Sequence, residues 1–135
     1  MQSSLIFWLL IGIILILAYE LFVPTITGNG GGQSSRNAAL ADIRGGIKTA
    51  LDRYKIDNDS FPKSFNDLVQ NPGDVKHWSG PYLDALPADP WGDKYIYEFP
   101  GKHNPNSYDL ISAGPDGKEG TDDDIGNWMT LQLVK

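Results

Sequence analysis

The chain has 135 residues, a length that suits one domain together with a terminal segment. Its formal net charge is −6 and its basic residues are scattered, so we expect no binding to nucleic acid, whose phosphates require a basic patch. Cysteine is absent, which excludes a disulfide framework, a thiolate metal site and a cysteine nucleophile.

An apolar run, LIFWLLIGIILILAYELFV, spans residues 5–23. As a helix that rises about 1.5 Å per residue it would extend roughly 28 Å, close to the roughly 30 Å thickness of the hydrocarbon layer of a bilayer. A cleaved export signal is the alternative, but no lysine or arginine precedes Arg36 and residues 19–24 contain no cleavage site of small residues. We therefore predict that residues 1–24 form a transmembrane or filament-core helix.

A glycine-rich stretch, residues 25–34, follows the apolar run and contains Gly28, Gly30, Gly31 and Gly32. Each glycine costs about 1 kcal/mol relative to alanine inside a helix, and side-chain pairs worth about 0.3 kcal/mol cannot offset this. The sequence therefore predicts a flexible break between the N-terminal helix and a globular head that spans residues 35–135.

The head is predicted to begin with a long amphipathic helix over residues 35–57. Its apolar residues recur at steps of three and four and so share one face: Leu40, Ile43, Ile47, Ala50, Leu51 and Tyr54. Gly45 and Gly46 weaken this helix by about 2 kcal/mol, whereas burial of one leucine or isoleucine returns about 1.5 to 3 kcal/mol. We expect a sheet to cover the apolar face.

In the rest of the head, the sequence predicts shorter elements. Ser64 is a candidate N-cap, with Asp67 three residues on, for a short helix that ends before Pro72. An aromatic and proline-rich loop follows over residues 78–91, and strands are predicted at residues 94–99, 108–112 and 129–134. One long helix packed on a small antiparallel sheet is an α+β fold with separate layers.

Few residues outside one acidic loop suggest chemistry. The sequence has no G-x-S-x-G motif, no phosphate-binding loop and no H-E-x-x-H motif. His77 and His103 have no partner at a metal-ligand spacing, so we interpret them as surface residues. Six aromatic residues are expected in the core, because each ring buries about 150 to 250 Å², with stacking on sugars as the alternative: Trp78, Tyr82, Trp91, Tyr95, Tyr97 and Phe99.

The acidic loop, GPDGKEGTDDDI, covers residues 114–125 between two predicted strands. Two carboxylates about 4 Å apart repel by about 1 kcal/mol in water and by about 4 kcal/mol at an effective dielectric constant near 20. Converging carboxylates would therefore separate unless a cation held them. Calcium suits such a loop because it takes roughly six to eight oxygen ligands in flexible geometry. The spacing is not that of an EF-hand, and a solvated acidic turn is the alternative.

Several short motifs occur in a fixed order along the head. They are GPYL at residues 80–83, LPADPWG at 86–92, YIY at 95–97, YDL at 108–110 and GPDG at 114–117, followed by Asp124 and Ile125. Over residues 38–128 this series resembles the major pseudopilins of type II secretion systems. The resemblance implies a type IV pilin-like fold and a structural subunit without catalytic activity.

The resemblance also implies how such a subunit assembles. N-terminal helices would pack into the core of a helical filament, the pseudopilus, with the heads outside. The core residues here would be Leu5, Ile6, Phe7, Trp8, Leu9, Leu10, Ile13, Ile14 and Leu17. The implied partners are other copies of the chain, an inner-membrane assembly platform with its ATPase, minor pseudopilins and, before assembly, membrane lipid. The implied location is the bacterial inner membrane with the head in the periplasm, and then a periplasmic or extracellular filament.

Members of the resembled family bind calcium in the loop between their last strands. By position, Asp116 and Asp124 match acidic ligands, and the backbone carbonyl of Ala113 matches another ligand. The loop is shorter than is usual in the family, so Asp122 and Asp123 are further candidates. The resemblance thus implies a calcium site drawn from Ala113, Asp116, Lys118, Asp122, Asp123 and Asp124.

The N-terminus departs from the family pattern, in which a short basic leader ends in glycine and a glutamate follows in the mature chain. Counting back from Pro24 places the mature start at Ser3, with Gln2 at the position of the glycine and Phe7 at that of the glutamate. Three explanations agree with this departure: a divergent filament subunit that uses a different register, an unprocessed membrane-bound relative, or an altered start of the sequence.

Two other functions stay open at this point. A membrane-anchored, calcium-dependent binding module or pilus-like adhesin subunit would use Trp78 and Trp91 to hold a sugar. A hydrolase based on the acidic loop would need two carboxylates at a fixed separation across a cleft, for which a head of this size leaves little room.

Overall fold

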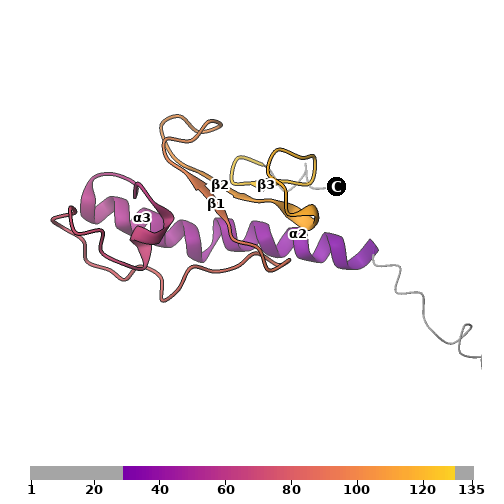
Figure 1. The fold of residues 1–135 in the computed structure, drawn as a ribbon, viewed down its shortest axis with the longest axis horizontal. Coiled ribbons are helices and arrows are strands. Elements are labelled where there is room, and N and C mark those ends of the chain that lie inside the picture. The colour runs from indigo at the N-terminus through magenta and orange to yellow at the C-terminus, as the bar shows by residue number, and fades with distance from the viewer. Residues whose placement is uncertain (1–28, 130–135) are drawn as a thin grey trace, which may run out of the picture.

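The computed structural model describes residues 29–129, and side chains from residue 32 onward. Helix α2 (Asn29–Arg44) and helix α3 (Gly46–Asn58) follow each other almost in line and form one long rod (Figure 1). A small sheet of strands β1 (Ile96–Glu98), β2 (Asp109–Ser112) and β3 (Ile125–Gly126) lies along one side of this rod. The predicted α+β fold, a long helix packed on a small antiparallel sheet, is confirmed.

The apolar face of the rod forms the core, as its spacing predicts. All six residues assigned to that face are at most 3% exposed. Gly45 separates the two helices, and a Cβ placed there would lie 2.6 Å from the carbonyl oxygen of Ala41. That contact is too short for a side chain, so the junction between the two helices suits glycine.

The helix begins earlier than the sequence predicts. Residues 29–34, assigned to a flexible break, are the first turns of α2, so the predicted boundary at residue 35 is wrong. Helix propagation adds one hydrogen bond for each residue fixed, and it can extend from a packed segment into residues of poor propensity. The buried turns that follow therefore stabilise the helical conformation of the glycines at 30–32.

The sheet has the order β1-β2-β3, and both pairs are antiparallel. Tyr97 lies opposite Leu110, and Ser112 lies opposite Ile125. The first two predicted strands are confirmed. The third strand of the sheet, Ile125–Gly126, pairs with β2 and was not predicted. Of the strand predicted at residues 129–134, Met129 is not in a strand, and residues 130–134 fall outside the described part of the chain.

Aromatic residues fill the space between the rod and the sheet. Tyr95 belongs to the cluster of buried core residues, and the other five aromatic residues assigned to the core are partly buried and pack against that cluster. Phe61 meets Tyr108 edge-on, with ring centroids 4.9 Å apart. The 3₁₀ helix η1 (Phe65–Leu68) has the predicted capping box between Ser64 and Asp67. The prediction of an aromatic core is confirmed.

The predicted N-terminal helix over residues 1–24, with its nine filament-core residues, lies outside the described residues. Between residues 29 and 129, neither helix combines the length and the apolar character that crossing a bilayer requires.

Candidate functional site

The acidic loop joins β2 to β3 and begins with a sharp turn, η2 (Gly114–Asp116). Gly114 has φ +66°, a conformation that favours glycine, and a Cβ there would lie 2.5 Å from the carbonyl oxygen of Asp123. The end of the loop therefore folds back onto its beginning. This closure brings residues 116 and 123–124 close to each other.

Three aspartates hold the closed loop together through hydrogen bonds to its own backbone and to Thr121. Asp116 Oδ1 accepts from the Lys118 amide at 2.8 Å. Asp123 Oδ2 accepts from the Asp116 amide at 3.2 Å, and Asp123 Oδ1 accepts from Thr121 Oγ1 at 2.5 Å. Asp124 Oδ2 accepts from the Gly120 amide at 2.7 Å. The carboxylates thus shape the loop.

The loop also favours negative charge on Asp123. The hydrogen bond from Thr121 is the main cause that lowers the pKa of the Asp123 carboxyl, and the positive charge of Arg36 contributes in the same direction. A carboxyl whose pKa is lowered is ionised at neutral pH. The site is therefore an anionic, oxygen-rich loop.

One carboxylate oxygen of the loop suits a hard cation. Asp124 Oδ1 is buried and has no hydrogen-bond partner. Such an atom costs free energy unless an ion or a water contacts it. Of the other candidate ligands, Asp122 and Lys118 are exposed and Ala113 is buried at the end of β2.

The carboxylates do not yet converge on one point. Between residues 29 and 129, no three histidine, aspartate or glutamate side chains form a group that could hold a metal ion. The donor set of aspartates and backbone carbonyls is nevertheless the one that calcium prefers. The residues fit calcium in chemistry, and binding would require the carboxylates now bonded to backbone amides to turn inward.

A buried polar contact that the sequence did not reveal supports the start of the loop. Ser112, at the end of β2, donates from Oγ to Asp89 Oδ2 at 2.5 Å. Asp89 Oδ1 accepts from the amides of Trp91 and Asp93. The Asp-Pro-Trp-Gly turn is therefore fastened to the strand that leads into the loop, and the LPADPWG motif at residues 86–92 was the only signal for it.

A second buried carboxylate, Asp109, organises the loop before β2. Its oxygens accept from the amides of His103 and Asn104 at 2.7 and 3.1 Å and from Asn104 Nδ2 at 2.8 Å. His103 also stacks on Trp128, with ring centroids 3.6 Å apart. The predicted surface position of both histidines is confirmed, but His103 has partners that the sequence did not indicate.

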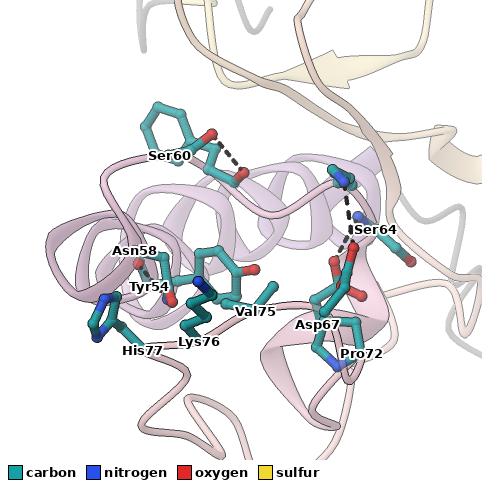
Figure 2. Close-up of a pocket in the computed structure, with 12 residues that line it drawn as sticks. Tyr54, Asn58, Ser60, Ser64, Asp67, Pro72, Val75, Lys76 and His77 are labelled. Carbon is teal, nitrogen blue, oxygen red and sulfur yellow. Dashed lines mark hydrogen bonds and ion pairs between the residues drawn. The ribbon is translucent and has the colours of Figure 1, made fainter.

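A hollow of about 430 Å³ lies beside the end of α3. Figure 2 shows the residues that line it. Asn58 lies in its wall, with Nδ2 donating to the Tyr54 carbonyl at 2.9 Å, while Asp67 accepts from the Ser64 amide and so serves the cap of η1. The two serine hydroxyls that line this hollow bond to backbone groups: Ser60 Oγ donates to the Phe61 carbonyl, and Ser64 Oγ accepts from the Asn66 amide. Trp78, assigned to a sugar-binding alternative, is half-buried and donates from Nε1 to the Asp67 carbonyl at 2.7 Å.

Comparison with known proteins assigns the chain to a protein family. Residues 27–128 match the family described as Type II secretion system (T2SS), protein G. The chain belongs to this family. The resemblance found in the sequence is confirmed, and the family is one of structural subunits, so the prediction of a non-enzymatic protein agrees with it.

Individual members of the family align over most of their length. The core protein G of the type II secretion system of Escherichia coli strain K12 is 41% identical over 116 residues, which cover 81% of this chain and 77% of that protein. The corresponding protein of Pseudomonas aeruginosa is 43% identical over 106 residues, which cover 71% of this chain and 72% of that protein. The closed loop and its supports thus lie within the aligned region of a family of secretion proteins.

A solved relative confirms the fold. The major pseudopilin from the type 2 secretion system of enterohaemorrhagic Escherichia coli superposes with a TM-score of 0.64 at 34% identity, covering 78% of this chain and 96% of that one. The predicted type IV pilin-like arrangement of a long helix and a small sheet is therefore shared with a major pseudopilin.

Proposed function

We propose that this chain is the major subunit of a pseudopilus, a helical filament that assembles from the inner membrane and drives protein secretion. The observation that carries the proposal is the family match over residues 27–128. The shape of the head supports it, because the first turns of α2 project beyond the sheet, away from the rest of the head (Figure 1). A helix that leaves the head in this way can continue into a filament core.

In this proposal the apolar residues 5–23 have two successive environments. They lie in inner-membrane lipid before assembly, with the head in the periplasm, and they pack against the same segment of other subunits afterwards. The apolar composition of the segment supports both, since a bilayer and a helical core both exclude charge. An assembly platform and minor pseudopilins are the partners that such a transfer requires.

The assembly proposal is tested by electron microscopy of the purified full-length chain. We expect the wild-type chain to form helical filaments. Leu9→Arg should form none, because arginine at the centre of an apolar helix costs about 2.5 to 3.5 kcal/mol. The matched control Leu9→Ile should form filaments as the wild type does. Filaments of Leu9→Arg, or a wild-type chain that stays monomeric under every condition, would contradict a core built from residues 5–23.

We also propose that calcium stabilises the head by binding in the acidic loop. The carboxylates of Asp116, Asp123 and Asp124 would hold it, with backbone carbonyls of Ala113 and Lys118, while Asp122 is a further carboxylate at the exposed edge. The unpaired, buried Asp124 Oδ1 supports this proposal. Bound calcium would supply the positive charge that lets these carboxylates approach one another. Binding to the folded state alone should add about 2.7 kcal/mol at a hundredfold excess over Kd.

The calcium proposal is tested by melting the full-length chain in calcium and in chelator. We expect calcium to raise the Tm of the wild-type chain and to leave that of Asp124→Asn almost unchanged. Asp84→Asn is the control, because Asp84 is an exposed aspartate outside the loop. If chelator leaves the wild-type Tm unchanged, the loop is a plain acidic turn.

A further inference from the structure

Two large apolar side chains are exposed on the head. Ile56, in the last turn of α3, is 77% exposed, and Leu86, at the start of the LPADPWG motif, is 38% exposed. Among the described residues no other large apolar side chain is exposed. A single exposed apolar residue is normal on a protein surface, but Leu86 also belongs to a hollow.

The Leu86 hollow has a volume of about 450 Å³ and lies between η1 and the segment that leads into β1. Much of its wall is apolar: Phe65, Leu86, Pro87, Ala88 and Tyr95. Pro87 also lines a smaller hollow of about 230 Å³, together with Ile47 of α3. The two hollows therefore adjoin and form one surface beside the start of α3.

The Ile56 side chain cannot enter the hollow of its own head. Ile56 follows Ile47 by nine residues, which correspond to about 2.5 turns and about 14 Å of helix. The two side chains therefore point to opposite sides of α3, and Ile47 is the one that is buried and borders the hollows. If the exposed isoleucine fills such a hollow, that hollow belongs to another copy of the chain.

The charges around the two features are complementary. Arg53 lies about one turn before the exposed isoleucine, and Asp59 lies three residues after it as the C-cap of α3. Asp84 lies two residues before the exposed leucine, and Lys94 lies in the wall of the hollow. All four side chains are exposed, and none forms an ion pair with another described residue. Each surface thus offers one charge of each sign beside an apolar centre.

We propose that Ile56 of one copy inserts into the Leu86 hollow of the next copy along the pseudopilus. The inference rests on the proposed function, which supplies identical copies in a regular array. In this contact Arg53 would face Asp84 and Asp59 would face Lys94, and such rim charges fix the orientation of two partners more than they add affinity.

The proposed contact is heterologous, because it joins two different surfaces of the same chain. Each copy that binds through its isoleucine still presents a free hollow, and each copy that binds through its hollow still presents a free isoleucine. A heterologous contact that does not close into a ring generates an open helical filament. The contact can therefore repeat along a growing pseudopilus.

Cross-linking of the full-length chain tests the contact directly, because the chain contains no cysteine of its own. Filaments of Ile56→Cys/Leu86→Cys, treated with a short thiol-reactive cross-linker, should yield a ladder of covalent multimers on a denaturing gel. The matched control Ile56→Cys/Asn106→Cys places the second cysteine at an exposed position outside the hollow and should yield no ladder. A mixture of the two single variants Ile56→Cys and Leu86→Cys should yield dimers, whereas each alone should not.

Charge substitutions provide a second measurement. Ile56→Lys should raise the critical concentration for filament formation about tenfold or more, because the contact loses a buried isoleucine. The Tm of the unassembled chain in detergent should stay unchanged, because Ile56 is exposed in the head. Ile56→Leu should assemble as the wild type does. Ile56→Lys/Leu86→Glu should recover assembly, because the two new charges pair across the contact.

The outcomes separate this inference from the proposed function. A ladder from Ile56→Cys/Leu86→Cys that the control lacks supports the inference. Filaments that give no ladder would overturn it and leave the proposed function standing, and dimers of Ile56→Cys alone would overturn it by revealing a symmetric contact. If the double-cysteine variant does not assemble, recovery by Ile56→Lys/Leu86→Glu supports the inference and a lack of recovery overturns it. A wild-type chain that forms no filaments would overturn the proposed function, and this inference with it.

Discussion

Gly45 and Gly46 are neighbours at the joint of the rod, yet only one of them is required. A Cβ on Gly45 would meet the carbonyl oxygen of Ala41 at 2.6 Å, whereas a Cβ on Gly46 would meet nothing within 4 Å. The helix-weakening character of this pair is visible in the sequence. The difference between the two glycines depends on the backbone of the preceding turn and is visible only in three dimensions.

This contrast gives a prediction at the residue scale. Gly45→Ala should lower the free energy of unfolding by about 1 to 3 kcal/mol, because the joint must shift to admit the methyl group. Gly46→Ala should raise it by up to about 1 kcal/mol, because alanine is the better helix former. Melting curves of the two full-length variants check this. Equal effects of the two substitutions would contradict the described joint.

The loop residues show the same limit of sequence reasoning. Asp116, Asp123 and Asp124 could be assigned to one site because they lie within a few residues of each other. Asp89 could not, since it reaches the start of the loop only through the packing of a distant segment. Its role follows from a hydrogen bond of 2.5 Å from Ser112 Oγ.

At the scale of elements, strand β2 is held at both ends by polar contacts, those of Asp109 at its start and of Ser112 at its end. Asp109 begins this strand and is 1% exposed. Burial alone would raise the pKa of its carboxyl, but the hydrogen bonds from His103 and Asn104 outweigh burial and place the pKa below its ordinary value of 3.8. A carboxyl with a lowered pKa contributes stability that is present above its ordinary pKa and is lost as the pH falls through the folded one.

The second prediction concerns this strand. Asp109→Asn should lower the free energy of unfolding at neutral pH by about 1 to 3 kcal/mol, because it removes a charged acceptor from several donors. The difference between variant and wild type should shrink as the pH falls below 3.8, where the wild-type carboxyl also becomes protonated. Urea unfolding of both chains as a function of pH measures it. A difference that stays constant with pH would contradict the account.

The elements differ in how well the sequence predicts them. The spacing of apolar residues identified the rod, and alternation or β-prone composition located β1 and β2. The start of α2 was missed because three glycines give residues 30–32 a low helix propensity. The packing of the later turns stabilises the helix enough to include them. Strand β3 was missed because it is too short to show a pattern, being only Ile125–Gly126.

At the scale of the whole molecule, the head is a rod with a sheet and two supported loops on one side (Figure 1). Helix α2 contacts β2 and β3, the two strands that the acidic loop joins. In the proposed filament, calcium binding would therefore act on the part of the head that continues into the core. Loss of calcium should weaken assembly as well as the head.

The measurement that tests the central claim most directly is secretion by cells in which this chain has been deleted and then restored. Mass spectrometry of the culture medium would compare wild type, Leu9→Arg and Leu9→Ile at equal cellular abundance. We predict that wild type and Leu9→Ile restore the secreted proteins and that Leu9→Arg does not. Unchanged secretion in the deletion strain, or full restoration by Leu9→Arg, would contradict a pseudopilus subunit that works through its N-terminal helix.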